Sequence, residues 1–540
     1  MKTRISPRLA TVSLLGVLPW LNPFAPGPSS WVGPWLFSAM CASLAFGLHG
    51  TGSPRWPVAA LLGSLAAWAG LRTGWSPETL ALAAACLLVW MMAAVTAGAA
   101  DRDRLVRLVA AGWVVAAAVS TAAALLQYFD AADWLAPWVN QSTGGEAYAN
   151  LRQRNQFASL TVIGIAAILW LGGRGLAGRP ATLAIAWLAA GNAATTSRTG
   201  LLELLLLGAV VWWWGGLRSP RTRLWLVALA AYLAAAVALP LLAQMVTGEP
   251  ANSLWTRVSA SEPCGSRIVL WSNVIALIAE RPWLGWGWGE LDFAHYSALY
   301  GGTRFCDILD NAHDLPLHLA VELGLPAAVA LCSVIAVAIW RGRPWREGDD
   351  TRQLGWTVLL VLGVHSLLEY PLWYGPFQMT LGLALGMLWP APARAHSQPA
   401  RPGAIGARLA LAFCFLLAAG YAAWDYFRAS QIYLPAERRA AAWQHDPLAR
   451  VGGSWLFRSQ LRFAELTLTP VTRANAAHMY ELATDLLHYS PEPAVIEKLL
   501  DSAVTLGRED EVLLHLARFR AAFPQSYAAW VQRNRRPAAS

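Results

Sequence analysis

The feature that most constrains this chain is a series of long apolar runs separated by short loops that carry arginine. A run of about 20 apolar residues crosses the hydrocarbon core of a bilayer as a helix. The sequence therefore predicts an all-α polytopic membrane bundle of about 13 spans. The runs fall at about residues 9–25, 31–48, 56–71, 78–98, 105–127, 156–172, 180–196, 199–216, 222–246, 315–340, 354–369, 372–390 and 405–425.

The composition and the charges support a membrane protein. The chain is 56% hydrophobic and 14% charged, whereas soluble domains carry about 25% charged residues. The net charge of +9 could indicate nucleic acid as a partner. However, the arginines lie in short loops between apolar runs, so we expect no nucleic acid. The first run lacks a small-residue cleavage site and is predicted to be a span.

The Lys/Arg bias predicts the orientation of the chain. With the N-terminus inside, the strongly basic short loops fall on one side. The loop at 130–155, a long loop at 247–314 and the C-terminus then face the outer side. The arginines assigned to the inner side are Arg102, Arg104, Arg107, Arg174, Arg179, Arg218, Arg221, Arg223, Arg341, Arg343, Arg346, Arg352, Arg394, Arg401 and Arg408.

After about residue 425 the apolar runs shorten and amphipathic periodicity appears at 436–444, 473–487, 493–507 and 510–523. This predicts a small helical domain of the tetratricopeptide kind, with a structural or a protein-binding role. We divide the chain into N-terminal transmembrane helices (1–128), transmembrane helices with the first outer loop (129–246), the long loop (247–314), C-terminal transmembrane helices (315–425) and the outer helical domain (426–540).

Two of the cysteines lie in the long outer loop. Cys264 and Cys306 could form a disulfide if that loop faces an oxidising compartment. The other cysteines lie inside apolar runs, where we expect membrane packing.

Three residues of the outer side could carry chemistry. Arg198 lies in TTSRTG, a short turn between two spans. Arg267 lies in a predicted amphipathic helix on the membrane surface and shares a face with Trp271. His313 lies at the mouth of the next span. Arginine suits phosphate oxygens and histidine can accept a proton near neutral pH, so the set fits displacement of a diphosphate. Headgroup anchoring is the plain alternative for each arginine.

Other polar groups are less specific. The segment 152–156 includes Gln153 and Arg154, and Tyr370 and Tyr374 lie at the outer end of a span. The pairs His318/Glu322 and His365/Glu369 are each four residues apart and could simply pair. The Asp101–Asp103 pair is better explained by a solvated loop than by a metal site. No spacing typical of metal ligands occurs, and we expect neither metal nor cofactor.

Together the motifs NLRQRNQFA, TTSRTG, GSRIVLW, PWLGWGWGE, DNAHDLPLHLAVELGLP and HSLLEYPLWYGPF resemble a known family. They are similar to the O-antigen ligase/polymerase-like membrane proteins (Wzy_C type), and within them to the pilin-type O-oligosaccharyltransferases (PglL/PilO type). The resemblance covers most of the chain from about residue 145 onward.

The resemblance implies a bacterial inner-membrane protein whose active site and C-terminal domain face the periplasm. It also implies an undecaprenyl-pyrophosphate-linked glycan as donor. By motif, Arg198 and Arg267 match pyrophosphate-binding arginines and His313 matches an essential histidine. Gln153 and either Tyr370 or Tyr374 match further family residues, and Arg154, Asn311 and Asp314 are expected to support the site. The family often has Asn where this chain has Asp314, which leaves the role of that residue open.

These features favour an O-oligosaccharyltransferase that moves a preassembled glycan onto Ser/Thr of a periplasmic protein such as a type IV pilin. His313 would act as the base and the arginines would hold the pyrophosphate. An O-antigen ligase acting on lipid A-core, or an O-antigen polymerase, would share this chemistry. A non-enzymatic transporter of polyprenyl-linked glycans is a further alternative.

Overall fold

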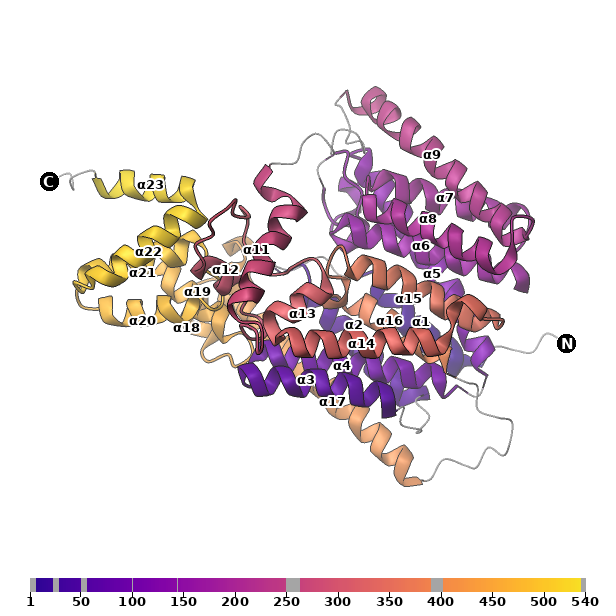
Figure 1. Ribbon diagram of the computed structural model, residues 1–540, viewed down its shortest axis with the longest axis horizontal. Coiled ribbons are helices and arrows are strands. Elements are labelled where there is room, and N and C mark those ends of the chain that lie inside the picture. The colour runs from indigo at the N-terminus through magenta and orange to yellow at the C-terminus, as the bar shows by residue number, and fades with distance from the viewer. Residues whose placement is uncertain are drawn as a thin grey trace. The chain divides into compact units, whose positions relative to one another are not determined.

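The computed structural model describes residues 6–22, 29–49, 56–99, 101–142, 144–248, 263–389 and 402–535, which form helices and no β-strand (Figure 1). The predicted inner arginines Arg394 and Arg401 lie outside these residues, as do residues 23–25 of the first predicted span and 249–262 of the long loop. The α-helices are α1 Pro7–Val17, α2 Val32–His49, α3 Trp56–Thr73, α4 Pro77–Ala97, α5 Arg102–Tyr128, α6 Arg154–Leu171, α7 Arg179–Ala194, α8 Arg198–Gly215, α9 Pro220–Thr247, α11 Arg267–Glu280, α12 Leu291–Ser297, α13 Leu315–Leu323, α14 Leu325–Gly342, α15 Asp350–Ser366, α16 Gly375–Leu388, α17 Pro402–Tyr433, α18 Pro447–Val451, α19 Arg458–Leu468, α20 Ala476–Leu486, α21 Pro493–Thr505, α22 Glu509–Ala522 and α23 Pro524–Arg535.

Seven helices of the described residues are long and apolar enough to cross a membrane. This fits a helical membrane protein. The other predicted runs form helices that are shorter or less apolar. The seven are Val32–His49, Pro77–Ala97, Arg102–Tyr128, Arg154–Arg174, Pro220–Thr247, Leu325–Arg346 and Gly403–Tyr433.

Two predicted helices differ in the structure. The run 315–340 is divided into α13 and α14 at Gly324, whose φ of +90° interrupts the helix. The segment 436–444 forms only two short 3₁₀ turns, Ala436–Arg438 and Ala441–Trp443. Here side-chain hydrogen bonds to the end of α17 and the residue after it override helix propensity, because the Ala440 backbone N–H donates to Gln431 Oε1 and the Arg439 side chain donates to the Leu434 carbonyl.

The chain folds into two compact units. The first unit comprises Met1–Ser64, Ala83–Ala260 and Ile335–Ala423, and the second comprises Leu65–Leu82, Ser261–Val334 and Trp424–Ser540. Each is described separately below.

Small residues allow the helices of the first unit to approach closely. Helices α5 to α9 lie side by side (Figure 1), and α6 is buried along almost its whole length. A Cβ added to Gly164 on α6 would lie 2.9 Å from the Ala117 side chain of α5. The apolar core of this unit also includes the fully buried Trp113 and Phe157.

The second unit contains two apolar clusters. One joins α11, α12 and α13 to the loop between them. The other joins helices α19 to α22 with Tyr296 of α12, and Phe293 of α12 packs against it. Helices α20 to α22, which the periodicity predicts, are present, while α19 and α23 were not expected. Because α12 contributes to the second cluster, the C-terminal helices pack directly on the long loop.

Candidate functional site

Arg198 is the first residue of α8 and its side chain is exposed. Ser197 is the N-cap, and its hydroxyl oxygen accepts a 3.0 Å hydrogen bond from the Gly200 backbone N–H. Gly200 allows the start of α8 to approach α6, because a Cβ there would lie 2.5 Å from the Ala158 side chain. The motif TTSRTG therefore encodes a cap, an arginine at the helix N-terminus and a close helix contact.

Arg154 is placed in the same way at the start of α6. It is the first residue of that helix and is exposed, and the Gln153 side chain caps the helix by accepting a 2.7 Å hydrogen bond from the Gln156 N–H. Asn155 joins the two helix starts, since its Oδ1 accepts a 2.6 Å hydrogen bond from the Ser197 hydroxyl. Two helix N-termini with arginines therefore meet, which is an arrangement that favours an anion.

A third element, the end of α15, contacts these two helix starts. Asn155 Nδ2 donates a 3.1 Å hydrogen bond to Glu369 Oε1, just beyond the end of α15. The rings of Tyr370 and Tyr374 follow, stacked with centroids 6.1 Å apart and both partly exposed. The tyrosines predicted from the sequence are thus joined, through Glu369 and Asn155, to the start of α8.

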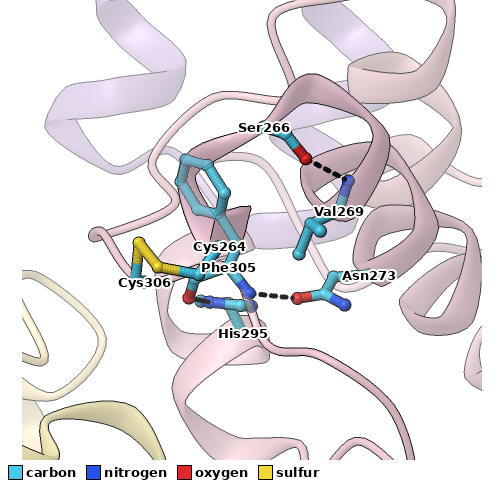
Figure 2. The surroundings of a disulfide bond; sticks show 7 residues. All are labelled: Cys264, Ser266, Val269, Asn273, His295, Phe305 and Cys306. Carbon is cyan, nitrogen blue, oxygen red and sulfur yellow. Dashed lines mark hydrogen bonds between the residues drawn. A yellow bond between two sulfur atoms is a disulfide. The ribbon is translucent and has the colours of Figure 1, made fainter. Parts of the chain in front are cut away.

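In the second unit, Arg267 is the first residue of α11. Its N-cap is Ser266, whose hydroxyl oxygen accepts a hydrogen bond of 3.3 Å from the Val269 backbone N–H (Figure 2). The same combination of a serine cap and an arginine thus occurs at Arg198 and Arg267. Cys264 and Cys306 form the predicted disulfide, with their Cα atoms 5.4 Å apart, immediately before this helix (Figure 2).

His313 lies in the left-handed backbone region with φ of +50°. Histidine adopts this conformation more readily than most residues, but it remains uncommon outside glycine. The His313 backbone N–H donates to Asn311 Oδ1 at 2.9 Å, and Trp271 Nε1 donates to the Ala312 carbonyl at 3.1 Å. Trp271 therefore attaches the His313 turn to α11, one helical turn after Arg267.

Asp314 is the N-cap of α13. Its Oδ1 accepts a 2.9 Å hydrogen bond from the Leu317 N–H. Burial raises the pKa of this carboxyl above its usual value, and the hydrogen bond from Leu317 lowers the pKa in part. Since Asn and Asp are comparable N-caps, the structure offers a helix-capping reason for either residue at this position.

The tryptophan- and glycine-rich turn after α11 pairs with the break between α13 and α14. The backbone N–H groups of Trp286 and Gly287 donate to the carbonyls of Val321 and Glu322 at 2.9 Å. Gly285 and Gly324 have positive φ, and a Cβ on either would collide with backbone atoms of the opposite segment. The predicted His318–Glu322 pair lies next to this contact, with 3.3 Å between His318 Nε2 and Glu322 Oε2.

A buried histidine organises the loop beside the disulfide. His295 Nδ1 lies 2.8 Å from the Tyr300 hydroxyl, and Nε2 lies 3.2 Å from the Phe305 carbonyl oxygen (Figure 2). Burial, and then the charge of Arg304, lower the pKa of His295 to about 3, so this imidazole is neutral. The C-terminal helices contact the same helix α12, because the Tyr296 hydroxyl lies 2.8 Å from His515 Nδ1.

The structure thus brings Arg198, Arg154 and Gln153 together in the first unit. It also brings Arg267, Asn311 and His313 into one loop assembly in the second. In the described part of the chain, no group of three or more His, Cys, Asp or Glu side chains could hold a metal ion.

Several polar residues escaped the sequence analysis. Ser159 and Glu203 lie in apolar helices, where Ser159 Oγ donates a 2.7 Å hydrogen bond to Glu203 Oε1. A lone acidic residue within an apolar helix is a signal that could have identified Glu203. The capping roles of Ser197 and Ser266 could also have been inferred, since serine precedes arginine at the start of both predicted helices.

Three family models match successive parts of the chain. The model "Protein glycosylation ligase" matches residues 147–171, "O-Antigen ligase" matches 183–332, and "Virulence factor membrane-bound polymerase, C-terminal" matches 353–537. The first segment includes α6, the second runs from within α7 to within α14, and the third runs from within α15 to the end of α23. These matches support the resemblance that the motifs indicate.

A curated protein of Acinetobacter baylyi, a general O-oligosaccharyltransferase, is 26% identical over 139 residues. The similarity covers 25% of this chain and 23% of that protein. The chain therefore matches less than a quarter of the length of this relative.

Proposed function

We propose that this chain, which resembles the O-antigen ligases and the protein glycosylation ligases, transfers a preassembled glycan from undecaprenyl pyrophosphate to Ser/Thr of periplasmic proteins such as a type IV pilin. The family matches point to glycosyl transfer, and the apolar helices fit a multi-pass membrane protein. The donor, the acceptor, the inner-membrane location and the roles of individual residues are our proposal.

One observation carries the proposal: Arg198 and Arg267 each begin a helix whose N-cap is a serine. The backbone N–H groups of a helix N-terminus and a guanidinium both favour phosphate oxygens. Each unit therefore presents one anion-binding helix start. A diphosphate has two phosphoryl groups, and we assign both arginines to its binding.

In the proposed reaction His313 takes the proton from the acceptor hydroxyl. The hydroxyl oxygen attacks the anomeric carbon of the glycan, and the bond from that carbon to the pyrophosphate oxygen breaks. The pyrophosphate leaves with the bonding electrons and is stabilised by Arg198 and Arg267. A single displacement inverts the configuration of the anomeric carbon.

The test is transfer by purified variants with a lipid-linked glycan and pilin. We expect H313A to lower the rate by about 10²–10⁴-fold, as for loss of a general base. Removing either arginine should cost about 10²–10³-fold. His478 is exposed on α20 and provides a matched control as H478A. Transfer by H313A at the rate of the control would overturn the assignment of the base.

The acceptor is tested by offering pilin and lipid A-core side by side with one donor. The similarity to a protein glycosylation ligase and to a general O-oligosaccharyltransferase favours pilin. Exclusive transfer to lipid A-core would instead identify an O-antigen ligase, and elongation of the lipid-linked glycan would identify a polymerase.

A further inference from the structure

The interior of the first unit contains a polar cluster that the proposed reaction does not use. Ser159 of α6 lies between Glu203 of α8 and His365 of α15. Its hydroxyl oxygen is 2.7 Å from Glu203 Oε1 and 2.8 Å from His365 Nδ1. The exposed fraction is 0% for Ser159 and His365 and 1% for Glu203.

No other charged residue lies in the interior of the helices that pack around this cluster. Helix α16, whose Phe377 ring contacts His365, contains no charged residue. Charged residues of the other contacting elements lie at or next to their ends. They are Asp101 before α5, Arg102, Asp103, Arg104 and Arg107 of α5, Arg152 before α6, Arg154 of α6, Arg174 after α6, Arg179 of α7, Arg198 of α8, Arg218 before α9, Arg221 and Arg223 of α9, Arg343, Arg346, Glu347 and Asp349 before α15, Asp350 and Arg352 of α15, and Glu369 after α15.

A bare carboxylate at this position would therefore face only His365, and only through the Ser159 hydroxyl. Burial of an ion without direct charge compensation is strongly unfavourable, so the group takes up a proton instead. Moreover, Glu203 Oε2 and His365 Nε2 are buried and have no hydrogen-bond partner among the described residues. These atoms can remain uncharged when Glu203 is a carboxylic acid and His365 is neutral.

The single proton of the hydroxyl then fixes the direction of the hydrogen bonds. Ser159 can donate to only one neighbour and must accept from the other. The Ser159 hydroxyl donates to Glu203 Oε1 and accepts from His365 Nδ1–H. The imidazole proton is then on Nδ1, and Glu203 holds its proton on Oε2. All three groups are neutral in this arrangement. It differs from the arrangement with an ionised Glu203 only by the proton on the Glu203 carboxyl.

We propose that Glu203, Ser159 and His365 form a buried proton-binding site that joins α6, α8 and α15. In this site Glu203 holds a proton at neutral pH. The same three elements are joined one to two helical turns away by Asn155, Ser197 and Glu369. Asn155 precedes Ser159 by four residues, and Glu369 follows His365 by four. The proton site therefore supports the helix starts that carry Arg154 and Arg198, and its members are positioning residues.

The direct test is infrared spectroscopy of the full chain in lipid nanodiscs at neutral pH. A protonated carboxylic acid gives a carbonyl band that is distinct from that of a carboxylate and shifts in heavy water. We expect such a band in the wild type, its loss in E203Q and its displacement in S159A. E497Q alters a half-buried carboxylate of α21 that pairs with Arg533 at 2.7 Å, and it should leave the band unchanged. Absence of a band that depends on Glu203 would overturn the proposal.

The positioning role rests on the proposed function and is tested by steady-state kinetics with the lipid-linked donor. We expect S159A to raise the KM for the donor severalfold with a smaller change in kcat, because Ser159 touches no substrate. E203Q retains a neutral hydrogen-bonding group and should preserve more donor binding than the apolar variant E203L. Equal losses in E203Q and E203L would contradict a protonated carboxyl. If H313A proves fully active, the proposed base is wrong, yet the infrared result still decides the proton site.

Discussion

The two units present an arginine in the same way but hold it by different means. In each, a serine caps a helix and the arginine is the next residue, at Arg198 in the first unit and Arg267 in the second. In the first unit, buried side-chain hydrogen bonds between helices fix the helix start. In the second, a disulfide, paired backbone segments and one indole fix the loops around it.

The difference follows from what surrounds each helix start. In the first unit α6 is buried along almost its whole length, so side chains from neighbouring helices are available as partners. The second unit's site is built on loops, which expose backbone groups that need partners of their own. The first arrangement should therefore depend on buried polar side chains, and the second on glycine and on cysteine oxidation.

The largest effect should come from the paired backbone segments of the second unit. In G285A the new Cβ would collide with the Glu322 backbone, at a φ of +66°. We expect the strain and the overpacking to cost about 2–6 kcal/mol together. Folded yield and transfer should both fall sharply. G302A is the control, because nothing lies within 4 Å of a Cβ there. Equal behaviour of the two variants would show that the segments are not tightly paired.

The next largest effect should come from reduction of the disulfide, which should destabilise the second unit and leave the first unaffected. Cys264 and Cys306 are 42 residues apart in sequence, and the chain-entropy model gives a stabilisation of about 4 kcal/mol for a loop of that size. We expect dithiothreitol to lower the unfolding temperature of the wild type and to have no effect on C264S/C306S. C41A, in the first unit, should remain sensitive to the reductant. A wild type that is indifferent to dithiothreitol would contradict a stabilising bridge.

A smaller effect is expected from crowding the helix starts of the first unit. G200A places a methyl group 2.5 Å from the Ala158 side chain, and overpacking of this kind costs about 1–3 kcal/mol. The start of α8 should shift and the KM for the donor should rise. The double variant A158G/G200A removes the colliding methyl group and should recover part of the donor binding. No recovery would indicate that the contact with Asn192, and not that with Ala158, limits the approach.

Acid should weaken the helices of the second unit that pack around His515. Burial, and then the charge of Arg518, lower the pKa of His515 to about 4, below the ordinary value of 6.5. Below pH 6.5 the unfolded chain binds a proton that the folded chain does not, so stability is lost as the pH falls toward 4. Hydrogen exchange of α12 and of α19 to α22 should increase between pH 7 and pH 5.

H515Q does not titrate and retains an acceptor for the Tyr296 hydroxyl, so it should reduce this pH dependence. His295 of α12 also has a lowered pKa and should account for the part that remains. An unchanged pH dependence of exchange in H515Q would contradict the contribution of His515.

The candidate residues at the helix starts were easier to predict from the sequence than the contacts that fix these helix starts in place. Arg198, Arg267 and His313 are visible because polar residues at the ends of apolar runs are conspicuous. The disulfide could be proposed because Cys264 and Cys306 were the cysteines in the polar loop. These predictions needed only local pattern. The structure places the candidate residues Arg198 and Arg267 at helix starts, and His313 just before the N-cap of α13.

Longer-range features were not predictable in this way. The break at Gly324 lies between two apolar helices, so the hydropathy is continuous across it. The break is explained by pairing with a backbone segment some 40 residues earlier in the chain. The Glu203–Ser159–His365 cluster assembles from three helices that are far apart in sequence. Residues 436–444 have strong helix propensity, but contacts made by Gln431 and Arg439 determine their conformation.

The smallest effect should come from Asp314, the position where this chain departs from the family's frequent Asn. As an N-cap, Asn is about as good as Asp, and loss of the cap typically costs about 1 kcal/mol. We therefore expect D314N to transfer glycan at nearly the wild-type rate and D314A to lose stability of about that size. Thermal unfolding and transfer rates of both variants provide the measurement. If D314N lost as much activity as H313A, the carboxylate would take part in proton transfer at His313, and the second unit would hold a catalytic pair instead of a capped turn.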